Sequence, residues 1–134
     1  MRWLGILFVA LVLMGCGRIQ NERFTGGSDG LPNGVALEVT LSNTESLQVA
    51  TSTEVQISLT QNGQLVSGAA LEIEGNMTHA GMEPVFATAT EVAPGDYRAL
   101  LEWTMGGDWL LTIRGTLPDG TVIEQQVNGL TVGS

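Results

Sequence analysis

Short runs of alternating apolar and polar residues, separated by turn-forming residues, fill the chain from Val35 onward. The runs are VALEVTL (35–41), TEVQISLTQ (53–61), AALEIEG (69–75), PVFATATEV (84–92), DYRALLEW (96–103), DWLLTIRGT (108–116) and TVIEQQVNGLTV (121–132). A period of two residues places the apolar side chains on one face of an extended strand. No stretch has a sustained helical period. The pattern therefore predicts an all-β fold, an immunoglobulin-like antiparallel β-sandwich over residues 34–134.

The segments between these runs contain strong turn signals. Asn62-Gly63 is typical of a tight hairpin, and Pro94-Gly95-Asp96 and Pro118-Asp119-Gly120 are typical of turns. The bulky residues available to fill the core are Trp103, Trp109, Phe86 and Tyr97.

The chain begins with a short apolar segment that does not fit the β pattern. Arg2 is followed by the uncharged run from Trp3 to Met14, which is shorter than the roughly 20 residues of a membrane span but matches a signal-peptide core. The segment ends in Leu13-Met14-Gly15-Cys16, which resembles the lipoprotein signal of bacteria. We expect removal of residues 1–15, a lipid on Cys16 and a membrane anchor on the extracytoplasmic face, although an ordinary signal peptide with an incidental Cys16 is the alternative.

Residues 16–33 are polar and rich in glycine, which predicts a flexible tether between the lipid and the domain. The net charge of the whole chain is −9, and loss of residues 1–15 removes Arg2 and no acid, so the mature charge is −10. Such acidity argues against binding of nucleic acid or anionic lipid head groups through charge. Cys16 is the only cysteine, so no disulfide can stabilise the domain.

After the expected cleavage, all three methionines and the sole histidine fall in two connections between strands. Met77, His79 and Met82 belong to the connection after the run 69–75, and Met105 belongs to the one between the runs 96–103 and 108–116. Consecutive antiparallel strands place alternate connections at the same end. We therefore expect these four residues to lie together at one end of the sandwich.

Thioether and imidazole groups form a soft, neutral set of donors. Thioethers favour Cu(I), and imidazole also suits copper, whereas calcium and magnesium require oxygen ligands. Met77, His79, Met82 and Met105 are therefore candidate ligands of a Cu(I) site. The alternative is structural, because methionine often fills the end of a β-sandwich and a single histidine is most often a surface residue.

Four ordered motifs resemble the YtkA-like and FixH-like domains of bacterial cell-envelope proteins, over about Gln61 to Gly120. The matching residues are Asn62, Gly63, Val66, Gly68 and Ala69; Met77, His79 and Met82; Pro94, Gly95, Tyr97 and Ala99; and Met105, Gly107, Trp109, Leu111 and Ile113. Met82 has a less fixed counterpart in the family and depends more on its spacing.

The resemblance implies an immunoglobulin-like fold related in shape to copper carriers of the CopC type. It also implies a role in copper handling or in maturation of a copper-containing respiratory oxidase, whose subunit would receive the metal. FixH-like members usually begin with a membrane helix, whereas YtkA-like members are often lipoproteins, and the Cys16 signal is similar to the second group.

A copper carrier has two alternatives. A binding or structural module would use the methionine and histidine residues only as apolar contact surface. An enzyme is not expected, because no Gly-x-Ser-x-Gly or Ser-x-x-Lys stretch accompanies His79. Glu72 and Glu74 are interpreted as solvated charges, and Glu102 and Asp108 near Met105 as residues that keep a strand edge soluble.

Overall fold

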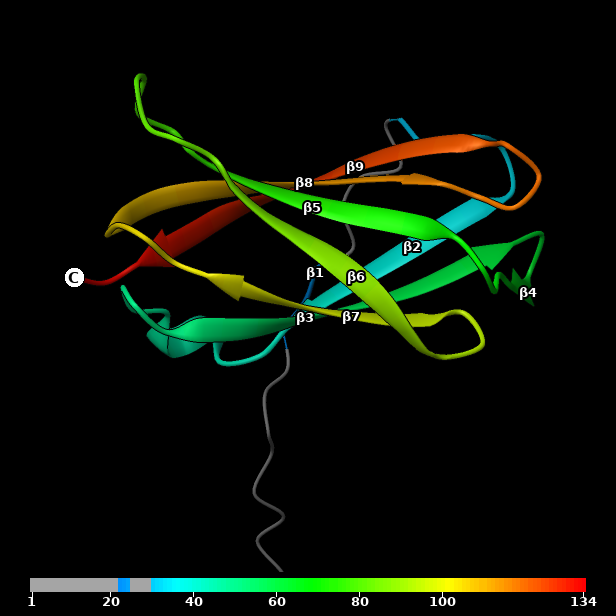
Figure 1. Cartoon of the computed structure of the whole chain (residues 1–134), viewed down its shortest axis with the longest axis horizontal. Helices are drawn as coiled ribbons and strands as arrows, with labels where there is room; N and C mark the ends of the chain where they lie inside the picture. Colours follow the sequence, from blue (N-terminus) through cyan, green and yellow to red (C-terminus); the bar gives the residue numbers. More distant parts are fainter. Residues whose placement is uncertain (1–21, 25–29) are drawn as a thin grey trace, which may run out of the picture.

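The computed structural model describes residues 22–24 and 30–134, and these form an all-β antiparallel sheet, which confirms the all-β, antiparallel part of the predicted fold class (Figure 1). The elements are β1 (Glu22–Phe24), β2 (Val35–Leu41), the short 3-10 helix η1 (Thr44–Ser46), β3 (Ser52–Gln61), β4 (Gln64–Leu65), β5 (Ala70–Met77), β6 (Val85–Ala93), β7 (Asp96–Glu102), β8 (Gly107–Thr116) and β9 (Val122–Val132). Among the described residues, no helix has the length and apolar character needed to cross a membrane.

The strands follow the order β1-β2-β3-β7-β6-β5-β8-β9, with β4 paired to β3. Strand β6 joins the two halves of the sheet, because Val85 to Ala89 pair with β5 whereas Thr90 to Ala93 pair with β7. Near the two ends of this order, Gln48 forms an isolated parallel bridge with Gly133. The sheet is therefore curved into a nearly closed barrel.

The turns follow the sequence signals closely. Asn62 and Gly63 both have positive φ angles, 52° and 77°, as a two-residue hairpin turn requires. This turn pairs Gln61 with Gln64. In the β6–β7 turn, which pairs Ala93 with Asp96, Gly95 has a positive φ (79°) and Pro94 does not. Glycine is favoured at both turns because left-handed backbone is costly for most other residues.

The core is built from the inward-facing residues of nearly every strand. Trp103, Trp109 and Tyr97 are almost completely buried, as expected from the sequence. The prediction that Phe86 fills the core was wrong, because its side chain is 59% exposed. The inward positions of β6 are Val85, Ala87 and Ala89, and Phe86 lies between them on the outer face.

The N-terminal boundary of the sheet lies within the segment predicted as a tether. Residues Glu22–Phe24 form β1 and pair with Val39 to Leu41 of β2, and Leu31 packs against the core. The predicted signal peptide 1–15 and the lipidated Cys16 lie outside the described residues, as does most of the rest of the predicted tether.

Glu91 on β6 holds the segment that leads from β4 to β5. Its carboxylate accepts hydrogen bonds from Ser67 Oγ and from the Gly68 amide (3.1 Å), and the side-chain bond to Ser67 is the main cause of its lowered pKa. Nearby, Tyr97 Oη donates to the Val66 carbonyl (2.7 Å) and accepts from the Ala69 amide (3.0 Å). The segment is thus attached to the barrel by two polar side chains.

We predict that Glu91→Gln makes stability less sensitive to acid. Because the folded state lowers the pKa of Glu91, its contribution is fully present above the ordinary Glu pKa of about 4.3 and is lost as the pH falls through the folded value. Urea unfolding at pH 7 and pH 3 measures the effect. The variant should lose less stability between these pH values than the unmodified protein, and an equal loss in both would contradict the assignment.

Candidate functional site

The connection between β5 and β6 lies against the start of β8. Met77, the last residue of β5, is the register partner of Trp109, and the Thr78 amide donates a hydrogen bond to the Asp108 carbonyl (3.0 Å). This fixes one side of residues 78–84 beside the β7–β8 connection. The prediction that the two connections share one end of the fold is therefore confirmed.

The β7–β8 connection, which carries Met105, is held by two tryptophans. The Trp109 indole Nε1–H donates a hydrogen bond to the Met105 carbonyl (3.0 Å). The rings of Trp109 and Trp103 pack edge to face, with centroids 5.4 Å apart and an interplanar angle of 69°. The favourable geometry of this aromatic pair and its burial give the turn a rigid base. The backbone position of Met105 is therefore set by the core.

Met77 packs closely against Gly107 at the beginning of β8. Gly107 has a φ of 134°, and a Cβ added there would lie 2.8 Å from the Cε methyl of Met77. Only glycine satisfies both the backbone angle and the space taken by this methyl group. Met77 is also partly buried against the core, so it belongs to the end of a strand and not to the loop proper.

Met82 and Met105 come from different connections and line the same pocket. This pocket has a volume of about 400 Å³ and is completed by the segment Gly81–Val85 and by Thr104. Met105 is 46% exposed, and Met82 is half-buried. Two thioethers that are far apart in the sequence therefore share one cavity that is open to solvent.

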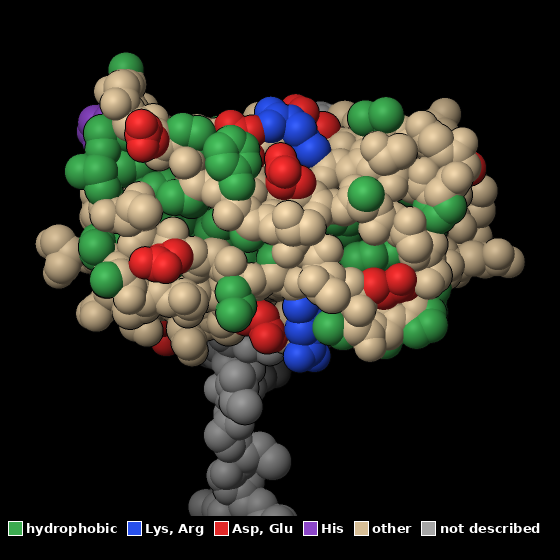
Figure 2. Space-filling view, in the orientation of Figure 1, with side chains coloured by type: hydrophobic (Ala, Val, Ile, Leu, Met, Phe, Trp, Pro, Cys, Tyr) green, Lys and Arg blue, Asp and Glu red, His purple; other side chains and the backbone are tan. Residues whose placement is uncertain are grey.

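His79 lies in the same connection as Met82 but is exposed and does not line that pocket. Figure 2 shows the imidazole at one end of the molecule, beside a group of hydrophobic side chains. The structure thus gathers the three sulfur-bearing residues at this end and places His79 at its outer margin. The role of all four as metal ligands stays a prediction.

Carboxylates surround this end without forming a separate cation site. Glu83 lines the methionine pocket, Glu102 is exposed at the end of β7, and Asp108 Oδ1 accepts a hydrogen bond from Thr131 Oγ1 (2.9 Å). Over the described part of the chain, no group of three or more His, Cys, Asp or Glu side chains could hold a metal ion.

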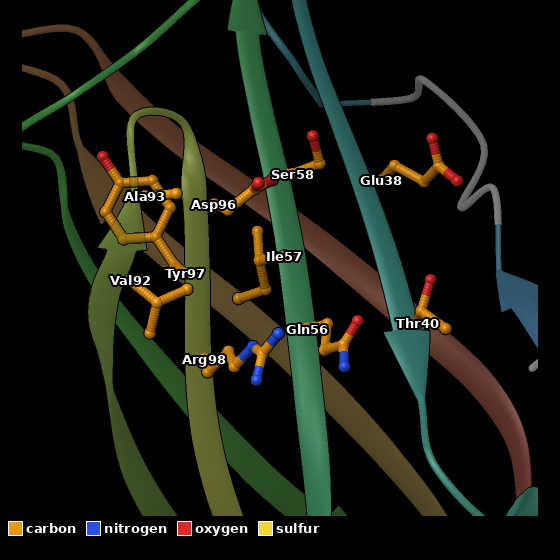
Figure 3. A pocket seen from close by; sticks show the side chains of 10 residues that line it. All are labelled: Glu38, Thr40, Gln56, Ile57, Ser58, Val92, Ala93, Asp96, Tyr97 and Arg98. Atoms are coloured by element: carbon orange, nitrogen blue, oxygen red, sulfur yellow. The ribbon is translucent and has the colours of Figure 1, made fainter.

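A second pocket, of about 490 Å³, lies on the outer face of β2, β3 and β7 (Figure 3). Its polar lining consists of carboxylates, hydroxyls, an amide and one guanidinium group. The residues that line it are Glu38, Thr40, Gln56, Ile57, Ser58, Val92, Ala93, Asp96, Tyr97 and Arg98. No methionine or histidine lines it, in contrast to the pocket of Met82 and Met105.

A family model described as YtkA-like matches residues 34–114, which is more than half of the chain. The chain belongs to the YtkA-like family. The match spans both connections, from Met77 to Met105, together with Gly107 and Trp109. No curated protein and no solved structure matches the chain.

The stretch Met105-x-Gly107-x-Trp109, which lies within the range matched by the family model, has a physical explanation in this fold. Met105 lines the pocket, Gly107 leaves space for Met77, and Trp109 holds the Met105 carbonyl. From the sequence, Trp109 was interpreted only as core filler, so its positioning role was missed. The spacing of the motif was visible, but the hydrogen bond depends on how the turn folds.

We predict that Gly107→Ala displaces the Met77 side chain and destabilises the YtkA-like domain by about 1–3 kcal/mol, since it adds backbone strain and a close contact. Thermal unfolding and the Met77 methyl resonance in NMR spectra measure the two effects. Gly120→Ala is the matched control, because Gly120 also has a positive φ (87°) but has open space around its Cβ position. Equal destabilisation, with an unmoved Met77 resonance, would contradict the contact.

Proposed function

We propose that this protein is a membrane-anchored, extracytoplasmic copper-binding protein that carries Cu(I) on a methionine- and histidine-based site. The observation that carries the proposal is the shared pocket of Met82 and Met105, two thioethers from separate connections. Met77, packed on Gly107 at the same end, is the third sulfur donor, and His79 at the margin supplies the imidazole.

The chemistry of these donors supports a soft ion as the cargo. Thioether sulfur is neutral and needs no deprotonation, so the set favours Cu(I) over cations that prefer oxygen ligands. The exposure of Met105 and the opening of the pocket suit a carrier, because a partner must reach the ion to remove it by ligand exchange. Glu83, at the pocket wall, adds favourable negative charge near a cation.

The anchor proposed for Cys16 completes this function. A lipidated Cys16 would hold the protein at the outer face of the membrane, and the following segment would raise the local concentration of the domain near a membrane partner. A subunit of a copper-containing respiratory oxidase is the partner that the family resemblance suggests.

The fold interpretation extends to an immunoglobulin-like sandwich. If β2, β3, β5, β6, β7, β8 and β9 correspond to strands A to G, the pairings A-B, B-E and E-D form one sheet, and C-F and F-G form the other. The additional pairing of β6 with β5 joins the two sheets at one side. This arrangement supports the proposed likeness to the CopC type of copper carrier.

An NMR titration with Ag(I), a stable substitute for Cu(I), tests the proposal. We expect binding of one ion, with shifts of the methyl groups of Met77, Met82 and Met105 and of the His79 ring. Zn(II) is the control ion, since methionine is not a usual zinc ligand. Unchanged methionine resonances in the presence of excess Ag(I) would favour the alternative of a structural or binding module without metal.

A further inference from the structure

Strands β6 and β7 pair only near the turn that joins them, and they diverge toward the methionine end of the barrel (Figure 1). Among the described residues, Thr90 and Arg98 form the register pair of β6 and β7 that lies farthest from their turn. Beyond this point, the first half of β6 stays with β5 and the second half of β7 stays with β3. We call the two diverging strand edges, residues 85–89 and 99–102, the notch. Val85, at the start of β6, and Thr104, just after β7, also line the pocket of Met82 and Met105.

The direction of the backbone groups at the notch follows from the hydrogen bonds on the opposite side of β7. The Trp103 amide donates to the Thr51 carbonyl (3.3 Å), and the Gly95 carbonyl accepts from the Leu59 amide (2.9 Å). Because bonding alternates along an antiparallel strand, the odd-numbered residues of β7 bond to β3. The amides and carbonyls of Leu100 and Glu102 therefore point into the notch.

The same alternation applies to β6. Thr90 is the first residue of β6 that pairs with β7, so the preceding Thr88 and Phe86 direct their backbone groups toward the notch, while Ala87 and Ala89 face β5. On the core side of these edges, two apolar side chains come together: a Cβ on Gly75 would lie 2.8 Å from Val85 Cγ2 and 3.6 Å from Leu101 Cδ2. The notch thus combines free strand edges with apolar side chains beneath them.

The side chains around the notch indicate what would bind there. Leu100 is 69% exposed and Phe86 is 59% exposed, one on each bordering strand. Glu102 follows two residues after Leu100 on the same outer face of β7, and Glu83 lies at the pocket beyond. Hydrophobic side chains are visible on this face of the molecule in Figure 2.

We propose that the notch binds an extended segment of a partner protein, which adds a strand to the free edge of β7 at Leu100 and Glu102. An open strand edge is matched by another extended backbone. Cross-strand pairing then requires an apolar residue opposite Leu100 and, two residues away, an arginine or lysine opposite Glu102. The next residues of that segment reach the Met82–Met105 pocket.

The inference deepens the proposed copper function, because a segment bound in this way delivers its own metal ligands to the pocket. Docking itself does not require metal, so it is measured in the absence of copper. A failure to dock is therefore distinguished from a failure to bind Cu(I), which is tested separately by the Ag(I) titration.

The test uses short synthetic peptides of β-branched residues that carry one arginine two positions from a valine, or a glutamate in its place. We expect the arginine peptide to bind at least fivefold more tightly and to shift the amide resonances of Phe86, Thr88, Leu100 and Glu102. Glu102→Arg should reverse the preference. Equal binding of the two peptides, or shifts confined to β9 or to other edges, would overturn the proposal.

One pair of serine variants and one proline variant separate docking from stability. Leu100→Ser should weaken peptide binding at least fivefold, whereas Val122→Ser, at a position that is 71% exposed on β9, should leave it unchanged. Leu100→Pro removes the amide that points into the notch without removing a bond to β3, so it should block docking in a folded protein. If Leu100→Pro fails to fold, the serine pair decides. Concentration-dependent dimerisation that competes with the peptide would assign the notch to a second copy and overturn the proposal.

Discussion

Replacement of both Met82 and Met105 by leucine is expected to lower Cu(I) affinity by about 100-fold or more while preserving the fold. Loss of one ligand is expected to cost about tenfold, or about 1.4 kcal/mol, and the two residues line one pocket. Leucine keeps nearly the volume of methionine, so the change removes the sulfur with little effect on packing. Competition with a Cu(I) chelator of known affinity measures the loss.

The control for this double variant introduces a thioether at a position remote from the proposed metal site. Leu65 lies in the β3–β4 hairpin, at the opposite end of the barrel from the methionine pocket, and is 60% exposed (Figure 1). Leu65→Met should leave Cu(I) affinity unchanged. Unaltered affinity in the Met82 and Met105 double variant would remove the basis of the proposed carrier function.

Truncation of Trp103 to alanine is expected to destabilise the domain by about 3–5 kcal/mol, the largest effect on stability of any single change considered. The side chain is fully buried, packs edge to face on Trp109, and donates from Nε1 to Thr53 Oγ1 at 2.7 Å. The change creates a large cavity and also leaves a buried hydroxyl without its donor. Urea unfolding at neutral pH measures the effect.

A milder Trp103 variant isolates the contribution of the indole N–H group, and an exposed leucine serves as the control. Trp103→Phe retains most of the ring but removes the N–H group, and should cost about 1–3 kcal/mol if the bond to Thr53 is made. Leu100→Ala, on the exposed face of β7, which ends just before Trp103, should change stability by less than about 0.5 kcal/mol. A similar loss in Trp103→Ala and Leu100→Ala would show that the tryptophan pair does not support this end of the fold.

Most strands could be predicted because local alternation and turn chemistry agree. The run 35–41 and the hairpin at Asn62-Gly63 each appear where the pattern places them. Phe86 shows the limit of this reasoning. Its neighbours on β6 alternate between valine or alanine and threonine, so the small residues Val85, Ala87 and Ala89 could face the core beside the bulky tryptophans. A prediction based on hydrophobicity alone therefore placed Phe86 on the wrong face of β6.

The shared end of the two methionine connections could also be predicted, because it depends only on strand direction. The contacts that organise this end could not. The packing of Met77 on Gly107 and the hydrogen bond from Trp109 to Met105 depend on tertiary distances and on the shape of one turn. The separation of β6 from β7 could not be predicted either, because nothing in the run 84–92 indicates where β6 changes its pairing partner from β5 to β7.

A crystal structure of the protein soaked with Ag(I) tests most directly whether the methionine end is a soft-metal site. The proposal predicts one silver ion bonded to the sulfur atoms of Met82 and Met105, with Met77 or His79 completing its coordination. Silver bound only to carboxylates, or at positions remote from the β5–β6 and β7–β8 connections, would contradict it.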